Sequence, residues 1–465
     1  MMPLCAGQLQ MRFGGQLIGA PEQPIGEVTT DSRRCTSKQT FVALKGDRFD
    51  AHDFVVDVLV QQPALLVLNR QWAEANSALL AGQTVWMVED TLAALGGIAR
   101  LAREAFTGPL VGITGSSGKT SVKEMLATIA RHTFGSDAVL ATQGNLNNHI
   151  GVPLTLLRLT PEHKFAIVEM GASGLGEIAA LADIARPNVA IVNNVMAAHV
   201  AGFGNLDGVA TTKAAIYEAL GSQGIAVINL DDSYAAKFAS QNAKRDVMTF
   251  SLQDASAQLY AQEIQLHEDC MSFVLCTDGE RVPVTVQVTG LHNVSNCLAA
   301  ASCARAAGIS TPDIVQGLAV YKGVQGRMNI LRCSSQVTLI DDTYNANPGS
   351  VKAAIDALTA FEGQRWLVLG DMGELGEEAE ALHADIGRYA RAAGFDQLIS
   401  VGPLSAAAAM QFVQGQICST HDLAVAYLQQ HIARQAGRIN ILIKGSRSAR
   451  MELIVRAMTD QQRNA

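Results

Sequence analysis

The central motif of the chain is Val111-Gly112-Ile113-Thr114-Gly115-Ser116-Ser117-Gly118-Lys119-Thr120-Ser121. Residues 109–113 are mostly apolar and predict a buried strand, residues 114–118 predict a tight turn, and residues 121–131 have the pattern of an amphipathic helix. Strand, turn and helix follow in the order of a phosphate-binding loop, where backbone N–H groups and a helix N-terminus face a phosphate. We therefore expect this chain to use ATP.

Two side chains of this loop have predicted roles. Lys119 is expected to contact the β- and γ-phosphates, and the Thr120 hydroxyl is expected to bind Mg²⁺. The match is to the shorter form T-G-x-x-G-K-[ST], because Ile113 stands where the longer pattern has glycine. A chance glycine-rich turn is the alternative, and the flanking strand and helix argue against it. The predicted ATP-binding residues here are Gly115, Ser116, Ser117, Gly118, Lys119, Thr120 and Ser121.

Length and composition limit the function. A chain of 465 residues is too long for one core, so several domains are expected. A formal net charge of -8 argues against nucleic-acid binding, which needs a basic field. No apolar run reaches the length that spans a bilayer, the start lacks a signal-peptide pattern, and the eight cysteines form no C-x-x-C pair. We expect a cytoplasmic, monomeric protein without membrane insertion.

Residues 1–90 are expected to form the first unit. Residues 30–34 and 41–52 each place a short apolar strand beside a loop with hydroxyl and basic groups. Such loops suit a diphosphate or a uracil ring. Ordinary polar loops have the same composition, so this pattern alone leaves both interpretations open.

Residues 91–322 alternate strands and helices around the phosphate loop, which predicts a parallel sheet covered on both faces. Glu169 follows a strand over 165–168 and His199 follows one over 189–192, so both lie past strand ends, where such sheets bind ligands. Lys213 lies on a predicted helix over 206–220. Taken singly, a loop histidine is most often a surface residue and a helix lysine a solvated charge. Residues 246–288 predict a small antiparallel excursion.

Residues 323–465 predict a second doubly wound sheet. Its expected strands cover 337–340, 365–369, 397–401 and 439–443, with polar loops at 341–348, 370–376 and 444–448. The expected fold class is therefore α/β with three domains. A small α/β N-terminal domain precedes a central P-loop domain with a parallel sheet and a C-terminal Rossmann-like domain.

The order of phosphate loop, strand-end glutamate, strand-end histidine, helix lysine and C-terminal α/β unit resembles the Mur ligase family, ATP-dependent amide-forming enzymes of peptidoglycan precursor synthesis. The strings at 142–153, 342–348, 370–376 and 444–448 are similar to the member that adds D-alanyl-D-alanine to the UDP-muramoyl-tripeptide. Residues 31–33 and 41–52 resemble its UDP-binding region, so the likeness spans nearly the whole chain.

The resemblance implies that ATP phosphorylates the terminal carboxylate of the tripeptide. The amine of D-alanyl-D-alanine then attacks the acyl phosphate, and ADP and phosphate leave. The product is the UDP-muramoyl-pentapeptide precursor. The whole-chain likeness favours meso-diaminopimelate over lysine as the third residue of the tripeptide. A site shared between domains also predicts an open form without substrates and a closed ternary form.

The resemblance also implies the metal site. Thr120 and Glu169 would hold the Mg²⁺ that bridges the β- and γ-phosphates, and His199 would bind a second ion. Lys213, if carbamylated, would steady that second ion, since a bare ammonium would repel it. Ala214-Ala215 stand where the family commonly has Gly-Glu, and Ala197 replaces a frequent proline. Lys119, Glu169, His199 and Lys213 are the implied catalytic residues.

Three further groups of residues follow from the resemblance. Adenine is expected between the second and third units, with Asn293 and Asn296 at its edge and Arg327, Asp342, Tyr344 and Asn345 at the ribose and phosphates. Lys444 and Ser446 are candidates for positioning D-alanyl-D-alanine or the phosphates. The candidates for binding the UDP substrate are Ser32, Arg33, Lys45, Gly46, Arg48, His52, Thr142, Asn145, Asn147, Asn148 and Ser173.

Three other functions stay open at this point. A folylpolyglutamate synthetase would share the loop and the modified lysine but should lack a UDP-binding N-terminal unit. A regulatory P-loop NTPase would hydrolyse ATP without a peptide acceptor and leave the third unit's motifs unexplained. A non-catalytic nucleotide-sugar binding module would leave Lys119, Glu169 and His199 without a purpose.

Overall fold

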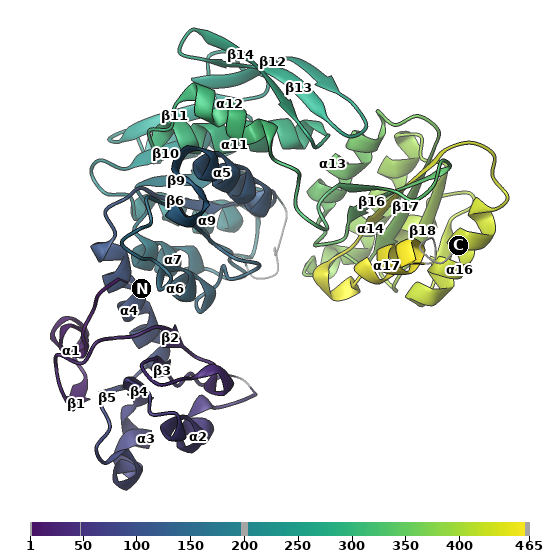
Figure 1. The fold of residues 1–465 in the computed structure, drawn as a ribbon. Coiled ribbons are helices and arrows are strands. Elements are labelled where there is room, and N and C mark those ends of the chain that lie inside the picture. Colours follow the sequence, from purple (N-terminus) through teal and green to yellow (C-terminus); the bar gives the residue numbers. More distant parts are fainter. Residues whose placement is uncertain (1, 47, 197–202, 461–465) are drawn as a thin grey trace.

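The structure is a computed structural model that describes residues 2–46, 48–196 and 203–460. Within these residues the chain folds into three lobes that follow one another in sequence (Figure 1). Each lobe is built on its own sheet, and the sheets contain β1–β5, β6–β14 and β15–β20. We call the lobes the N-terminal, central and C-terminal units.

The N-terminal unit has a five-stranded sheet in the order β1-β5-β4-β3-β2. Among the described strands of this sheet, only β1 pairs in the antiparallel sense, with β5. Its strands are β1 Gln16–Ile18, β2 Val28–Thr29, β3 Thr40–Val42, β4 Leu65–Asn69 and β5 Val85–Val88, and its helices are α1 Ala6–Phe13, α2 Val55–Val60 and α3 Arg70–Ala75. Helix α4 (Thr91–Ala105) then leads into the central unit; Asp90 caps its start by accepting hydrogen bonds from two backbone N–H groups.

The central unit has the strand order β14-β13-β12-β11-β10-β9-β6-β8-β7. Its described strands are β6 Leu110–Thr114, β7 Val139–Ala141, β8 Phe165–Glu169, β9 Val189–Val192, β10 Ile225–Asn229, β11 Asp246–Ser251, β12 Leu259–Leu266, β13 Met271–Thr277 and β14 Glu280–Val286. Its described helices are α5 Lys119–Phe134, α6 Gly151–Leu156, α7 Glu177–Ala185, α9 Leu206–Glu218, α10 Ala235–Gln241, α11 Leu291–Ala306 and α12 Thr311–Ala319. The strands from β7 to β12 are parallel, as expected for a sheet covered by crossover helices.

The C-terminal unit has the strand order β15-β16-β20-β17-β18-β19, and within residues 323–460 only β15 is antiparallel. Its strands are β15 Asn329–Arg332, β16 Val337–Asp342, β17 Gln364–Gly370, β18 Gln397–Val401, β19 Gln416–Cys418 and β20 Ile439–Lys444. Its described helices are α13 Pro348–Leu358, α14 Ala379–Ala392, α15 Ala406–Ala409, α16 His421–Ile432 and α17 Glu452–Asp460. The predicted doubly wound sheet is therefore present.

The predicted α/β class with three sheets is confirmed. One detail was wrong: residues 246–288 do not form a wholly antiparallel excursion. Strand β11 pairs parallel with both β10 and β12, and only β12, β13 and β14 pair antiparallel. Alternating polar residues marked the half-exposed strands correctly, but they carry no information on strand direction.

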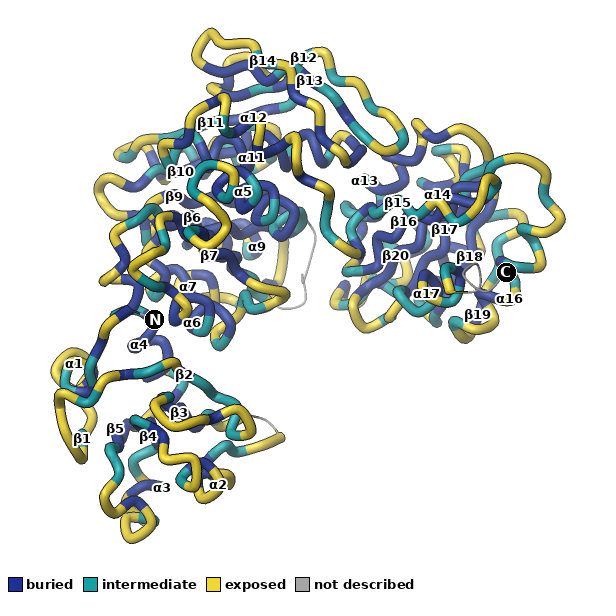
Figure 2. The backbone as a smooth tube through the Cα atoms, in the orientation of Figure 1, coloured by how far each residue is buried: buried dark blue, intermediate teal, exposed yellow. Residues whose placement is uncertain are grey.

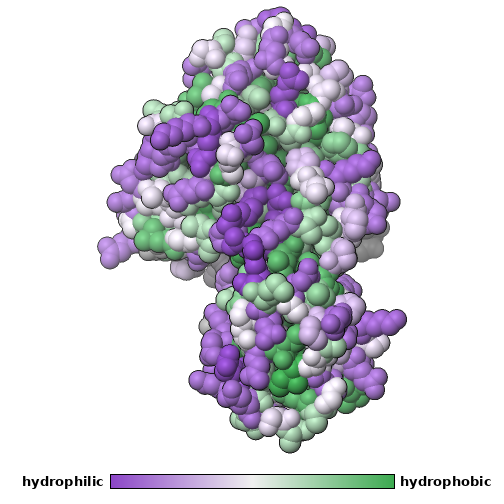
Figure 3. Space-filling model, turned by 90° about the vertical axis from the view of Figure 1, so that its left-hand side faces the viewer, coloured by the Kyte–Doolittle hydropathy of each residue, from purple (hydrophilic) through white to green (hydrophobic). Residues whose placement is uncertain are grey.

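The N-terminal and central units share one hydrophobic core. Leu9, Val42 and Trp86 of the first unit belong to the same buried cluster as Leu95 of α4 and Val168 of β8. The two faces of the C-terminal sheet have separate clusters of their own. Figure 2 shows the buried backbone continuing through α4, and in Figure 3 hydrophobic residues gather on the lower, N-terminal lobe and at its junction. Packing thus fixes the first two units together more firmly than the third.

Among the described residues, no helix combines the length and the apolar composition needed to cross a membrane.

Candidate active site

A cleft of about 1230 Å³ lies between the central and C-terminal units. The carboxyl ends of parallel strands from both sheets face it, with Glu169 at the end of β8, Asp342 at the end of β16 and Lys444 at the end of β20. Such strand ends are where open α/β sheets bind ligands. The lining includes the predicted ATP-binding residues Ser116, Ser117, Gly118, Lys119, Ser121, Asn293, Asn296, Arg327, Asp342, Tyr344 and Asn345.

The phosphate loop joins β6 to α5, as predicted. Gly118 has φ +77°, and a Cβ there would lie 2.5 Å from Asn296 Oδ1 and 2.6 Å from Asn193 Nδ2. Glycine is therefore required at this position, both for its left-handed backbone and for the close approach of α11. Gly118, Lys119 and Ser121 at the start of α5 line the cleft. The first backbone N–H groups of a helix have no intrahelical acceptor, which suits an anion.

Lys119 is folded back on its own loop. Its Nζ donates to the Gly115 carbonyl at 2.6 Å, and the side chain is half-buried. Burial lowers the pKa of the Lys119 ammonium, while the Glu169 carboxylate partly opposes this shift. An anionic phosphate in the loop would supply the counter-charge that the buried ammonium lacks.

Thr120 and Glu169 meet at the base of the cleft. The Thr120 hydroxyl donates to Glu169 Oε2 at 2.9 Å and accepts from Arg327 Nη2 at 3.0 Å. Asn147 Nδ2 donates to the other carboxylate oxygen at 2.9 Å. Thr120 and Asn147, which are far apart in sequence, therefore both contact the Glu169 carboxylate, and Glu169 is 2% exposed.

Two asparagines that follow β9 brace the phosphate loop. Asn194 Oδ1 accepts from Ser117 N at 2.8 Å, while the amide groups of Asn193 and Asn194 donate to the Ser117 carbonyl at 3.0 and 3.1 Å. Neither Asn193 nor Asn194 was predicted from the sequence to have a role. Their place directly after a parallel strand next to β6 was the available signal, because that strand end must face the loop.

Lys213 is buried on α9, with 2% of its surface exposed. Its Nζ lies 5.8 Å from the centre of the Phe203 ring. Burial, with a smaller contribution from Lys119, lowers the Lys213 pKa from 10.5 to about 7. It is therefore not the solvated charge that helix lysines usually are. His199 lies outside the described residues.

The helix α11 presents two amide side chains to the cleft, as predicted. Asn293 Nδ2 donates to the Thr289 carbonyl at 2.8 Å, and Asn296 Nδ2 lies 3.3 Å from Asn293 Oδ1. Asn296 Oδ1 also accepts from Asn193 Nδ2 at 3.2 Å, which ties α11 to the phosphate loop.

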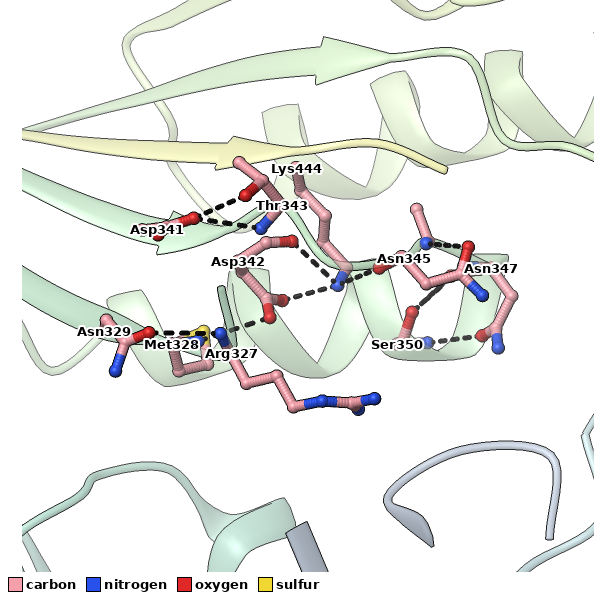
Figure 4. Close-up of polar contacts among 11 residues, drawn as sticks. Arg327, Met328, Asn329, Asp341, Asp342, Thr343, Asn345, Asn347, Ser350 and Lys444 are labelled. Atoms are coloured by element: carbon pink, nitrogen blue, oxygen red, sulfur yellow. Dashed lines mark hydrogen bonds and ion pairs between the residues drawn. The ribbon is translucent and has the colours of Figure 1, made fainter. Parts of the chain in front are cut away.

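The C-terminal unit contributes a compact polar cluster (Figure 4). The Lys444 ammonium, 3% exposed, pairs with the Asp342 carboxylate and donates to the Asn345 carbonyl at 2.9 Å. The Arg327 guanidinium carbon lies 4.4 Å from the centre of the Tyr344 ring, a cation–π distance. Ser446 Oγ donates to the Asp371 carbonyl at 2.6 Å. Arg327 extends from this cluster toward the central unit.

Comparison with known proteins identifies the family to which this architecture is similar. The Mur ligase middle domain matches residues 113–304, and the Mur ligase glutamate ligase domain matches residues 326–447. The UDP-N-acetylmuramoyl-tripeptide--D-alanyl-D-alanine ligase of Escherichia coli is 41% identical, with 99% of each chain covered. The chain belongs to the Mur ligase family.

Solved structures of Mur ligases are similar over the full length. The crystal structure of MurF from Acinetobacter baumannii is 34% identical, covers 99% of each chain and superimposes with a TM-score of 0.91. MurF ligase from Thermotoga maritima in complex with ADP is 26% identical, covers 94% of this chain and 98% of its own, and has a TM-score of 0.83.

The UDP-substrate candidates of this Mur ligase fall into two groups. Asn145, Asn147, Asn148 and Ser173 line the cleft on the central unit. Thr142 is buried behind them, and its hydroxyl accepts from Glu169 N at 3.0 Å. The remaining candidates lie on the N-terminal unit and do not line the cleft: Ser32, Arg33, Lys45, Gly46, Arg48 and His52.

Two of the N-terminal candidates are already engaged within their own unit. Arg33 Nε donates to Asp31 Oδ1 at 2.9 Å, and Arg33 Nη2 lies 2.8 Å from Asp31 Oδ2. His52 Nδ1 lies 2.6 Å from Asp50, and His52 Nε2 accepts from Asn69 N at 3.0 Å. His52 thus holds its loop against β4.

Proposed function

We propose that this Mur ligase joins D-alanyl-D-alanine to UDP-N-acetylmuramoyl-tripeptide, at the expense of ATP, and so forms the UDP-muramoyl-pentapeptide precursor of peptidoglycan. The observation that carries this proposal is the cleft in which the phosphate loop and Glu169 meet Arg327 of the C-terminal unit. Full-length similarity to ligases that bear this activity in their names supports the choice of substrates.

The chemistry has two steps. A terminal carboxylate oxygen of the tripeptide attacks the γ-phosphorus of ATP, so that ADP leaves and an acyl phosphate forms. The amine of D-alanyl-D-alanine then attacks the acyl carbon, loses a proton and expels phosphate. Phosphorylation is needed because an unmodified carboxylate would have to expel an oxide.

The reaction gathers several anions, so cations must surround the transferring group. Lys119 is proposed to contact the β- and γ-phosphates. Its Nζ lies on the phosphate loop at the Gly115 carbonyl, and Arg327 of the other unit reaches the Thr120 hydroxyl of the same loop. Fixed cations in a site with little water stabilise the charge that spreads over the phosphoryl oxygens. Asn293, Asn296, Asp342, Tyr344 and Asn345 are proposed to hold the adenosine, and Lys444 and Ser446 to orient the incoming dipeptide or the phosphates.

The residues present fit Mg²⁺. The Thr120 hydroxyl and the Glu169 carboxylate offer neighbouring oxygen donors, the ligand type that Mg²⁺ prefers. Within the described residues, no group of three or more His, Cys, Asp or Glu side chains that could hold a metal ion is found. When bound, Mg²⁺ would neutralise charge on the β- and γ-phosphates.

Lys213 is proposed to be carbamylated. Its depressed pKa leaves much of the amine neutral near pH 7, and only a neutral amine reacts with carbon dioxide. The product is a carboxylate-like anion, which with His199 would serve a second metal ion. The role of His199 follows from the family resemblance alone.

We propose that residues 1–90 bind the UDP end of the substrate, that residues 91–322 bind ATP, and that residues 323–465 close over the dipeptide. Asn145, Asn147, Asn148 and Ser173 line the cleft on the side of the central unit, where the peptide stem would reach the phosphate loop. We propose meso-diaminopimelate as the third residue of the tripeptide, and a monomer that acts in the cytoplasm.

A phosphate-release assay tests the function. Purified protein with ATP, Mg²⁺ and UDP-N-acetylmuramoyl-tripeptide should release phosphate on addition of D-alanyl-D-alanine, and the pentapeptide should be detected by mass. Addition of D-alanine alone serves as the control. Absence of both the new amide and an acyl phosphate trapped by hydroxylamine would refute the proposal. Release of phosphate without any acceptor would support a regulatory NTPase instead.

A further inference from the structure

Lys123 is a buried cation that the proposed reaction leaves without a role. It lies on α5, one turn beyond Lys119, and only 1% of its surface is exposed. A charged side chain is rarely buried so completely unless it is paired and hydrogen-bonded, because desolvation of an ammonium is costly.

The partners of Lys123 lead toward the active site. Its Nζ donates to the Thr142 carbonyl at 2.8 Å and forms an ion pair with Glu124 Oε1 at 2.8 Å. Thr142 directly follows β7 and extends the pairing of β7 with β8, because its N–H donates to the Ile167 carbonyl of β8 at 3.0 Å. Lys123 therefore fixes the peptide at which the chain leaves the sheet and enters the loop before α6.

This loop holds Glu169 from two sides. The Thr142 hydroxyl accepts from Glu169 N at 3.0 Å, and Asn147 Nδ2 donates to Glu169 Oε1 at 2.9 Å. The Asn147 carbonyl also accepts from Gly171 N at 2.8 Å. The direction in which the Glu169 carboxylate points thus depends on where this loop lies.

The contacts close into a ring that begins and ends on α5. Thr120 donates to Glu169, and the loop holds both the backbone and the side chain of Glu169. Lys123, three residues beyond Thr120 on α5, in turn holds the loop. We propose that Lys123 is a positioning residue that keeps the Glu169 carboxylate aimed at the Thr120 hydroxyl, where the nucleotide-bound cation is held. This inference rests on the proposed use of ATP and Mg²⁺.

A role in filling space does not account for a lysine here. An apolar side chain of similar length would fill the space without the desolvation cost, and buried ion pairs are weak contributors to stability. The ammonium instead holds a backbone carbonyl and a carboxylate at once, which an apolar side chain cannot do. Groups that orient metal ligands in this way typically change metal affinity about 10- to 100-fold when they are removed.

The test is the variant Lys123→Met. Binding of a fluorescent ADP is measured across a Mg²⁺ titration, and the Mg²⁺ concentration at half-maximal effect is compared with that of the unmodified protein. We expect this midpoint to rise about 10- to 100-fold, while metal-free ADP binds as before. An unchanged midpoint would overturn the proposal.

Arg103→Met is the matched control. Arg103 is also a buried cation of the central unit, and it donates to the Ala185, Phe106 and Arg186 carbonyls and to Asn188 Oδ1, away from the cleft. This variant should lower the unfolding temperature but keep the Mg²⁺ midpoint. If Lys123→Met behaves in the same way, its role is structural and the proposal fails.

Thr142→Val gives a second test that holds even if Lys123→Met does not fold. It removes the hydroxyl that accepts from Glu169 N but keeps the size of the side chain. The Mg²⁺ midpoint should rise in the same direction, and an unchanged midpoint would contradict the ring. These measurements need no peptide substrate, so a failure of the ligase reaction and a failure of the positioning role give different results.

Discussion

Arg327 of the C-terminal unit lies with its Nη2 3.0 Å from the hydroxyl of Thr120 in the phosphate loop. This contact joins two units that otherwise have separate hydrophobic cores. It also places a guanidinium beside the predicted metal ligand, so Arg327 must adjust when a metal–nucleotide complex enters. We therefore expect occupancy of the loop to influence the orientation of the C-terminal unit through Arg327.

Replacement of Arg327 by methionine should therefore impair catalysis more than substrate binding. We expect kcat/KM for ATP to fall about 100- to 1000-fold, because a fixed cation near the transferring phosphoryl group is lost. Affinity for the UDP substrate should stay within a factor of a few. Steady-state kinetics and calorimetry measure the two effects.

The control for this prediction is Arg388→Met. Arg388 lies on α14 of the same unit, is half-exposed and pairs with Asp385, and neither residue lines the cleft. Its loss should leave kcat/KM nearly unchanged, since exposed ion pairs contribute little. Equal losses in both variants would contradict a specific role of Arg327.

Lys119→Ala should lower the rate of phosphoryl transfer by orders of magnitude. The ammonium lies at the turn of the phosphate loop and is the side chain expected at the β- and γ-phosphates. The variant should still bind UDP-N-acetylmuramoyl-tripeptide, which is measured by the quenching of intrinsic fluorescence. Turnover at the normal rate would refute the assignment of the loop.

Site residues could be predicted from the sequence where the order of strands and turns along the chain determines where a residue lies. Strand ends of parallel sheets meet at one edge, so Glu169, Asp342 and Lys444 could be placed from periodicity and crossover handedness. The glycine at 118 was predictable because a tight turn before a helix needs a left-handed residue.

Other features depend on packing between distant elements. Lys123 looks like an ordinary helix lysine in the sequence, and only the approach of Thr142 from the neighbouring β7 shows why it is buried. The core shared through α4 and the parallel pairing of β11 were likewise missed, because neither changes the local hydrophobic pattern.

Stability should depend on the pH through Lys213. Its pKa is about 7 in the folded chain and near 10.5 when unfolded, so between these values the unfolded state binds more protons and stability rises with pH. Below pH 7 the full cost of desolvation, on the order of a few kcal/mol, opposes folding. Lys213→Met should therefore stabilise the chain most below pH 7, with a gain that shrinks toward pH 10.5 in thermal unfolding.

A second substitution at this position tests the carbamate. Lys213→Ala should be inactive, and a small added carboxylic acid should partly restore activity by replacing the carbamate anion. The mass of the protein that retains Lys213, measured under carbon dioxide with trapping of the labile group, should exceed the sequence mass by one carbon dioxide and the trapping group. Failure of rescue together with an unmodified mass would remove the carbamate from the mechanism.

A cluster of ion pairs should bias the opening of the C-terminal unit. Glu268, in the turn between β12 and β13, lies 2.6 Å from Arg438 and 3.7 Å from Arg332. Because these groups are partly exposed, Glu268→Gln should cost no more than about 1 kcal/mol of stability. Small-angle scattering should nevertheless show a changed distribution of shapes at low salt, with the difference lost at high salt as the pairs are screened. Identical profiles at every salt concentration would show that the cluster does not restrain the unit.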